Sequence, residues 1–226
     1  MSQRGAELLL NQLRLKKELW VCVATGASPR GLYEHLAHNY QETPQLFDKL
    51  SILKLDEWGG IPLNDPHSCH SYVQDFLLKP LNISPDRYIA FDSEADNVEN
   101  DCQRIQQSID KRQSIDVCIL GLGQNGHLGF NEPADFLQRD CHIAQLSTLT
   151  MQHNMVQSMA RCPTYGMTVG LKDIMQSKKI ILLIAGQNKK AIFNSLMSKR
   201  ISTQLPASLL WLHEDVECFV KRSKLT

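Results

Sequence analysis

Two kinds of hydrophobic pattern alternate along the chain. Short runs with consecutive apolar positions predict buried strands, and longer segments with apolar residues three or four apart predict amphipathic helices. The predicted strands cover residues 19–25, 50–55, 87–91, 115–122, 179–186 and 216–220. The predicted helices lie near residues 4–16, 29–39, 68–78, 97–111, 147–160 and 187–199.

This alternation predicts an α/β fold. Strands that are apolar on both faces and separated by helices are typical of a parallel sheet covered on both sides. We therefore expect a three-layer α/β/α architecture with a mainly parallel, Rossmann-like central sheet. The 226 residues contain no internal repeat, low-complexity tract or Pro/Ser-rich linker, so a single domain spanning residues 1–226 is expected.

Composition narrows the classes of partner and compartment. Lys and Arg together number 24, as do Asp and Glu, so the formal net charge is zero and there is no electrostatic footprint for nucleic acid. No apolar run approaches the roughly 18 residues of a membrane span, and the N-terminal segment lacks a signal-peptide cleavage site. The seven cysteines are scattered without a C-x-x-C pair. We therefore expect a reduced, cytoplasmic protein that has no disulfide framework or metal site and binds neither nucleic acid nor membrane.

Candidate functional residues are sought at the carboxyl ends of the predicted strands, where parallel sheets bind ligands. The first strand is followed by a small, hydroxyl-rich stretch that leads into a helix, with Pro29 suited to its first turn. Such a turn offers free N–H groups for a phosphate, or it is a plain strand-to-helix turn capped by Ser28. The stretch leaves both readings open, and its residues are Thr25, Gly26, Ala27 and Ser28.

The second predicted strand is closed by two carboxylates, Asp56 and Glu57. A carboxylate facing the ligand crevice could act as a base, although on spacing alone a loop carboxylate that caps a backbone N–H is favoured. Lys54 points to the same face as Asp56 by strand alternation. It could therefore tune Asp56 or simply pair with it.

The stretch "GLGQNGHLGFNEP" at residues 121–133 begins with the G-x-G-x-x-G pattern of dinucleotide-binding loops. A long helix should follow those glycines, but Gly129 and Pro133 prevent it. The dinucleotide reading is therefore disfavoured. What remains is His127 with a carboxylate partner, Glu132, five residues on and the polar Asn125 nearby, an arrangement suited to acid/base chemistry.

These stretches also carry a resemblance to a known family. The sequence resembles the glucosamine-6-phosphate deaminase/isomerase family, whose fold is shared with 6-phosphogluconolactonases. "DEW", in place of the Asp-Glu-Tyr of many glucosamine enzymes, together with "ATGASP", "GLGQNGHLG" and "PASLLWLH", makes it most similar to the galactosamine-6-phosphate isomerase/deaminase branch. The matching motifs span nearly the whole chain and are "ATGASP" (24–29), "LDEW" (55–58), "GLGQNGHLGFNEP" (121–133), "GMTVGLKDI" (166–174) and "PASLLWLH" (206–213).

The resemblance implies a role for each candidate residue. The loop from Thr25 to Ser28 would bind the sugar phosphate, and Lys189 would reach the same phosphate. Asp56 would be the base that moves the proton at C2. His127, supported by Glu132, would help to open the pyranose ring.

Three departures from the family pattern matter. Asn125, often Asp in the family, can orient His127 by hydrogen bonds but cannot raise its pKa by charge. Val156 stands where glucosamine enzymes place a phosphate-binding Arg, and His153, one turn earlier, would take over part of that role. The chain also starts late relative to the family, whose first strand is expected to be missing or trimmed.

The resemblance implies an amino-sugar-phosphate deaminase/isomerase, acting on galactosamine 6-phosphate or glucosamine 6-phosphate. The reaction gives a ketohexose 6-phosphate and ammonia, and no step needs a metal or a redox cofactor. Two alternatives stay open: a 6-phosphogluconolactonase and a non-catalytic sugar-phosphate sensor on the same fold. The partner is a small amino-sugar phosphate, and a homo-oligomer is left open.

Overall fold

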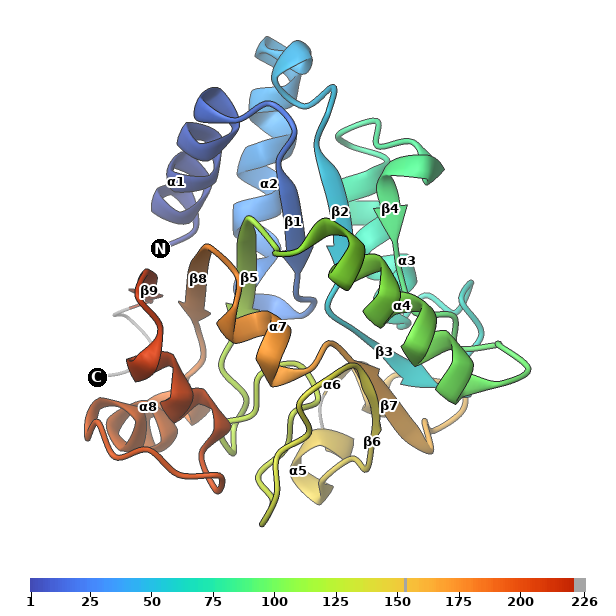
Figure 1. Cartoon of the computed structure of the whole chain (residues 1–226), viewed down its shortest axis with the longest axis vertical. Coiled ribbons are helices and arrows are strands. Elements are labelled where there is room, and N and C mark those ends of the chain that lie inside the picture. The colour runs from blue at the N-terminus through green and yellow to red at the C-terminus, as the bar shows by residue number, and fades with distance from the viewer. Residues whose placement is uncertain (153, 222–226) are drawn as a thin grey trace.

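The computed structural model describes residues 1–152 and 154–221, and its centre is a six-stranded parallel sheet (Figure 1). The strand order is β4-β2-β1-β5-β8-β9, and every neighbouring pair is parallel. All six strands predicted from the sequence are confirmed. Their bounds are β1 (Trp20–Val23), β2 (Ser51–Lys54), β4 (Tyr88–Ile89), β5 (Val117–Gly121), β8 (Lys179–Ile184) and β9 (Val216–Val220).

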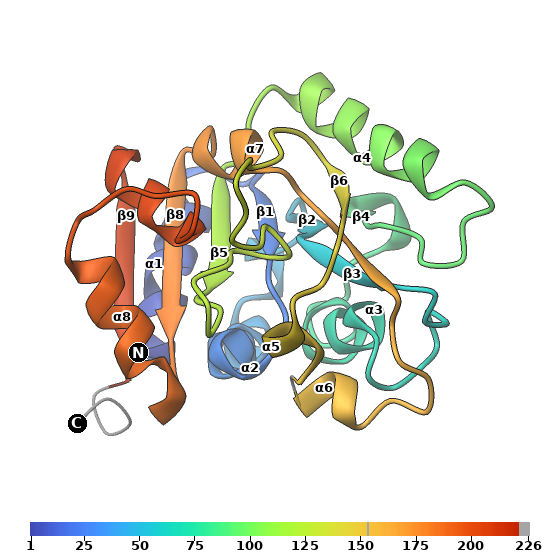
Figure 2. The ribbon, with the colours of Figure 1, turned by 90° about the horizontal axis from the view of Figure 1, so that it is seen from below.

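Helices cover both faces of this sheet, which confirms the three-layer architecture (Figure 2). One face carries α1 (Ser2–Leu15), α2 (Ala27–Glu42) and α3 (Cys69–Val73), which continues as a π-helix (Gln74–Leu78). The other face carries α4 (Val98–Arg112) and α7 (Leu171–Met175), and α8 (Lys190–Met197) and the 3₁₀ helix Pro206–Leu212 pack into the same core. Three further 3₁₀ turns lie at Pro44–Leu46, Pro85–Arg87 and Gln187–Lys189.

Successive strand residues explain why both faces are covered. In β1, Trp20 and Cys22 enter the core beneath α4, while Val21 and Val23 enter the core beneath α1 and α2. Side chains alternate between the faces of a strand, so a strand that is apolar at every position must be buried on both sides. The burial of both faces of β1 is therefore the arrangement that its uninterrupted apolar sequence predicts.

A second, antiparallel sheet was not predicted. It has the order β3-β7-β6, with β3 (Asp56–Gly59), β7 (Tyr165–Thr168) and β6 (His142–Ala144). The expectation that Asp56 closes the second strand is wrong, because β2 ends at Lys54 and Asp56 begins β3 after one residue. The chain thus leaves the central sheet at Leu55, beside the carboxyl end of β2.

The predicted helix at 147–160 is also wrong in its extent. The structure has two single-turn helices there, α5 (Thr148–Met151) and α6 (Asn154–Gln157). Ser147 begins the first of them, since its hydroxyl accepts the N–H of Thr150 at 3.2 Å. All seven cysteines are free thiols, and in the described parts of the chain no helix is long and apolar enough to cross a membrane.

Candidate active site

A cavity of about 290 Å³ opens at the carboxyl ends of the central strands. Segments that follow β1, β2, β5 and β8 line it, and so do α5 and Met155 of α6. These segments are far apart in the sequence and meet because parallel strands end at one edge of the sheet. The candidate residues that line the cavity are Thr25, Gly26, Ala27, Ser28, Asp56, His127 and Lys189.

The loop after β1 has the geometry of an anion site. Gly26 adopts a φ of +92°, and the 16-residue helix α2 begins directly after it at Ala27. The first N–H groups of a helix have no partner within the helix and carry the positive end of its dipole. Ser28 lies in the first turn of α2, and the cap is Gly26, so the alternative in which Ser28 caps the helix is wrong. The hydroxyl of Tyr72 donates to the Gly26 carbonyl at 2.7 Å and braces the turn.

Asp56 is 7% exposed, and its carboxyl faces this cavity. Burial, together with the negative charge of Glu57, raises the pKa of Asp56 to about 7, against the opposing effects of Lys54 and the Cys69 thiol. Its Oδ1 atom has no hydrogen-bond partner among the residues that the structure describes. A carboxyl with this pKa and a free oxygen is suited to take up and return a proton near neutral pH.

His127 is held by a network of polar side chains. Its Nδ1 lies 3.3 Å from Glu132 Oε2 and 3.3 Å from Thr150 Oγ1. Asn125 Nδ2 donates to Glu132 Oε2 at 2.6 Å, and Asn125 Oδ1 accepts the backbone N–H of His127 at 3.2 Å. Asn125 therefore orients both members of the pair without a charge.

Glu132 is the anionic centre of that network. Burial alone would raise the pKa of Glu132, but the hydrogen bonds from His127, Thr150 and Asn125 and the charge of His127 outweigh it. They lower the pKa of Glu132 to about 2. The carboxylate is therefore ionised at neutral pH and accepts the hydrogen bonds of Asn125 and Thr150.

The glycines of the "GLGQNG" stretch make room for the histidine. A Cβ on Gly123 would lie 2.2 Å from Cδ2 of His127, so only glycine permits this approach. Gly126 adopts a φ of +89°, which turns the chain back toward the cavity. The G-x-G-x-x-G match therefore reflects the packing of His127, and a dinucleotide is not needed to explain it.

Among the described residues that line the cavity, Lys189 is the one lysine or arginine. Lys189 lines the cavity, its Nζ donates to the Leu122 carbonyl at 2.5 Å, and burial lowers the pKa of Lys189 to about 8. Val156 is 2% exposed in an apolar cluster with Trp58 and Phe130. His153, the predicted substitute for the missing Arg, lies outside the described residues.

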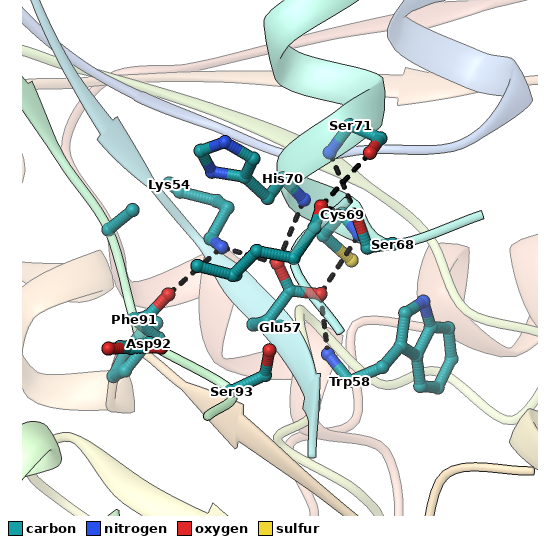
Figure 3. Close-up of polar contacts among 12 residues, drawn as sticks. Lys54, Glu57, Trp58, Ser68, Cys69, His70, Ser71, Phe91, Asp92 and Ser93 are labelled. Carbon is teal, nitrogen blue, oxygen red and sulfur yellow. Dashed lines mark hydrogen bonds and ion pairs between the residues drawn. The ribbon is translucent and has the colours of Figure 1, made fainter. Parts of the chain in front are cut away.

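Lys54 does not pair with Asp56. Its ammonium donates to Glu57, and both side chains are completely buried (Figure 3). The sequence analysis also missed Thr150, whose hydroxyl donates to Glu132. The sequence around Ser147 and Thr150 is typical of a capped helix start, so it could have predicted the local fold. No nearby residue indicates that Thr150 contacts Glu132. In the described parts of the chain no group of three or more His, Cys, Asp or Glu residues could hold a metal ion.

Comparison with known sequences shows that this chain is similar to glucosamine-6-phosphate isomerases and deaminases. A family model described as "Glucosamine-6-phosphate isomerases/6-phosphogluconolactonase" matches residues 1–219. The chain is 39% identical to "Putative deaminase AgaI" of Escherichia coli (strain K12), over 97% of this chain and 87% of that protein. It is 33% identical to glucosamine-6-phosphate deaminase 1 of Bacillus subtilis (strain 168), over 98% of this chain and 93% of that protein.

Comparison with solved structures extends this result to the fold. A monomeric glucosamine-6-phosphate deaminase matches with a TM-score of 0.94 at 32% identity, over 100% of this chain and 95% of that chain. The 6-phosphogluconolactonase from Trypanosoma brucei matches with a TM-score of 0.71 at 17% identity, over 97% of this chain and 91% of that chain. At that identity the second likeness concerns the fold alone.

Proposed function

This chain belongs to the glucosamine-6-phosphate isomerase/6-phosphogluconolactonase family, and we propose that it is an amino-sugar-phosphate deaminase/isomerase. The proposed substrate is galactosamine 6-phosphate, favoured by the "LDEW" motif, or its glucosamine epimer. With water it gives a ketohexose 6-phosphate and ammonia. The observation that carries the proposal is the buried carboxyl of Asp56, which lines the same cavity as His127 and the anion-binding loop.

Ring opening is the first step. The pyranose ring opens when O5 gains a proton and O1 loses one, and a histidine near neutrality is suited to both transfers. Glu132 and Thr150 engage Nδ1 of His127, so the transfers would use Nε2. The ionised Glu132 would hold the imidazole ring in place through Nδ1 while these protons move.

Proton transfer between C2 and C1 is the second step. The open-chain aldehyde acidifies the C2 proton, and ionised Asp56 takes it through Oδ1 while O1 regains the proton that it lost on ring opening, which gives an enolamine. The same carboxyl then returns a proton to C1, and the resulting C2 ketimine reacts with water and releases ammonia. With a pKa of about 7, the ionised Asp56 carboxylate is basic enough to accept the proton, and the protonated carboxyl is acidic enough to return it.

Phosphate binding positions the substrate for these steps. The N–H groups at the start of α2 and the ammonium of Lys189 line one cavity and are the natural partners of a dianion. The phosphate is remote from C2, so its binding contributes orientation rather than chemistry. Trp58 and Phe130 line the cavity and belong to one apolar cluster with Val156, so this side of the cavity provides packing and no charge.

An ammonia-release assay with galactosamine 6-phosphate and glucosamine 6-phosphate in parallel tests the proposal. We expect turnover of at least one epimer and exchange of its C2 proton with deuterium from the solvent. Asp56→Asn should lose turnover by a factor of roughly 10²–10⁴. An Asp56→Asn protein with near-normal turnover and C2 exchange would refute the role of Asp56.

The same samples separate the alternatives. Hydrolysis of 6-phosphogluconolactone without ammonia release from either amino sugar would indicate a lactonase. Tight binding of both epimers, followed by calorimetry, without any turnover would indicate a sensor. Both outcomes contradict the deaminase proposal.

A further inference from the structure

A buried ion pair joins Lys54 to Glu57, which directly follows Asp56 of the cavity lining, and the proposed reaction does not use it (Figure 3). Lys54 is the last residue of β2, Glu57 is the second residue of β3, and both are 0% exposed. Removing two charges from water is costly, and well-packed apolar residues of similar volume are often as stable or more stable. The pair therefore calls for a reason other than stability.

Glu57 joins two elements of the structure through one carboxylate. Its Oε1 accepts the N–H groups of Trp58 and Cys69, both at 2.9 Å. Its Oε2 accepts the N–H of His70 at 2.8 Å and the ammonium of Lys54. Lys54 also donates to the Phe91 carbonyl at 3.1 Å. Strand β3 and the first turn of α3 are thereby fixed to each other at the carboxyl end of β2.

The groups fixed in this way adjoin the reacting centre. Asp56 immediately precedes Glu57, and the Cys69 thiol lies close enough to the Asp56 carboxyl to lower its pKa. The same sulfur lies 3.5 Å from Oγ1 of Thr25 in the anion-binding loop. Cys69 is 0% exposed, so its thiol connects the proposed base to the loop from behind the cavity.

We propose that Glu57 is a positioning residue, which holds Asp56 and the Cys69 thiol together through β3 and the start of α3, and that Lys54 balances its charge beside the proposed base. The proposal rests on the proposed function only for calling Asp56 a base. The juxtaposition of the four side chains is independent of any substrate.

The groups that face Asp56 make the proposal measurable. The negative charge of Glu57 raises the pKa of Asp56, whereas Lys54 and the Cys69 thiol lower it. The other groups around Asp56 are Cys22 on β1, Tyr33 on α2, and His127 and Lys189, which line the same cavity. Burial raises the pKa of both Cys22 and Tyr33, so neither is charged near neutral pH.

Three further groups face the ion pair itself. They are His70 on α3, Tyr88 on β4 and Asp92. Burial lowers the pKa of His70 and raises that of Tyr88, so both are neutral at pH 7. Because His70 and Tyr88 are neutral, they do not offset the change in charge beside Asp56 when Lys54 or Glu57 is substituted.

Carbon-13 NMR of protein labelled at the aspartate carboxyls follows the titration of Asp56 without any substrate. The resonance is identified by its loss in Asp56→Asn. We expect Glu57→Gln to lower the pKa of Asp56 and Lys54→Met, which leaves the Glu57 charge unbalanced, to raise it, each by roughly one unit. The acid limb of kcat/KM should move in the same directions.

Asp116→Asn is the matched control. It removes the charge of another buried carboxylate, since Asp116 is 6% exposed and accepts from the partly exposed Lys16 at 2.7 Å and Lys178 at 2.9 Å. Asp116 precedes β5, at the amino end of the sheet and away from the cavity. This variant should lose stability yet leave the titration of Asp56 in place.

Cys69 provides a pair of variants that leave the ion pair intact. Cys69→Ala removes the donor to Asp56 and should raise its pKa, and Cys69→Ser, which keeps a donor, should restore it. If the two charge variants do not fold, this pair decides the result. An Asp56 titration that is unmoved by Cys69→Ala, or unmoved by both charge variants, overturns the proposal. A wild-type protein with the expected titrations and no ammonia release would count against the proposed function alone.

Discussion

The ionised Glu132 side chain should stabilise the folded chain by an amount that depends on pH. The perturbation is Glu132→Gln, which keeps the shape of the side chain and removes its charge. The pKa of Glu132 is about 2 in the folded chain against an ordinary value of 4.5. A folded-state pKa that is depressed contributes stability above the unfolded pKa and loses it as the pH falls through the folded pKa. The window is therefore pH 4.5 down to about 2.

The magnitude follows from the size of that difference. A change of one pKa unit corresponds to about 1.4 kcal/mol, so the charge contributes about 3 kcal/mol at pH 7. At pH 3.5 the same linkage leaves about 2 kcal/mol. Urea unfolding of wild-type protein and Glu132→Gln at both pH values measures this difference. We expect the difference in unfolding free energy to shrink by about 1 kcal/mol between pH 7 and pH 3.5.

A matched substitution at an exposed position separates this effect from a general effect of charge. Glu214 is exposed on the segment before β9, and Glu214→Gln should change the unfolding free energy by no more than about 0.5 kcal/mol at either pH. If Glu132→Gln and Glu214→Gln gave the same small, pH-independent difference, the network around His127 would not hold Glu132 ionised. The reasoning that assigns Glu132 to the support of His127 would then be refuted.

Three further predictions concern the cavity. The pKa of Asp56 at about 7 predicts that kcat/KM for the amino sugar falls about tenfold per pH unit below pH 7, and an acid limb beginning near pH 5 would contradict it. Lys189→Met should raise KM at least about tenfold with little change in kcat, and the KM of the wild type should rise above pH 8 as Lys189 loses its proton. Initial rates from pH 5 to pH 9 measure both effects, and equal KM values for the two proteins would exclude Lys189 from the phosphate site. Val156→Arg should destabilise the fold by roughly 3 kcal/mol or more, since it places a charge in an apolar cluster. Thermal unfolding measures this loss, and an undiminished stability together with a lower KM would contradict the prediction.

The central sheet was predictable because its signal is local. In β5 and β8, apolar residues occupy consecutive positions, and in α4 they recur at Cys102, Ile105 and Ile109. Both patterns follow from burial of a strand on two faces and a helix on one. The second sheet was missed because β3, β6 and β7 have only three or four residues each. Such short strands leave too few positions for a period to be recognised.

The candidate site divides in the same way. His127 and Glu132 lie five residues apart in one loop, so their pairing was foreseen from the spacing and is present in the structure. Thr150 reaches the same carboxylate from a distant segment, and Cys69 reaches Asp56 from the start of α3. No local pattern encodes either contact, because each depends on the packing of two elements that are far apart in the chain.

By itself the sequence determined the class of fold, the edge of the sheet at which the cavity opens and several of the residues that line it. These follow from hydrophobic periodicity, turn chemistry and residue type, which act over a few neighbouring positions. Only the tertiary structure decided the partners of those residues. Strand alternation placed Lys54 with Asp56, but the chain leaves the sheet at Leu55, and Lys54 pairs with Glu57 instead. Burial and the charges brought together by packing, which no stretch of sequence contains, then move the pKa of Asp56 toward neutrality.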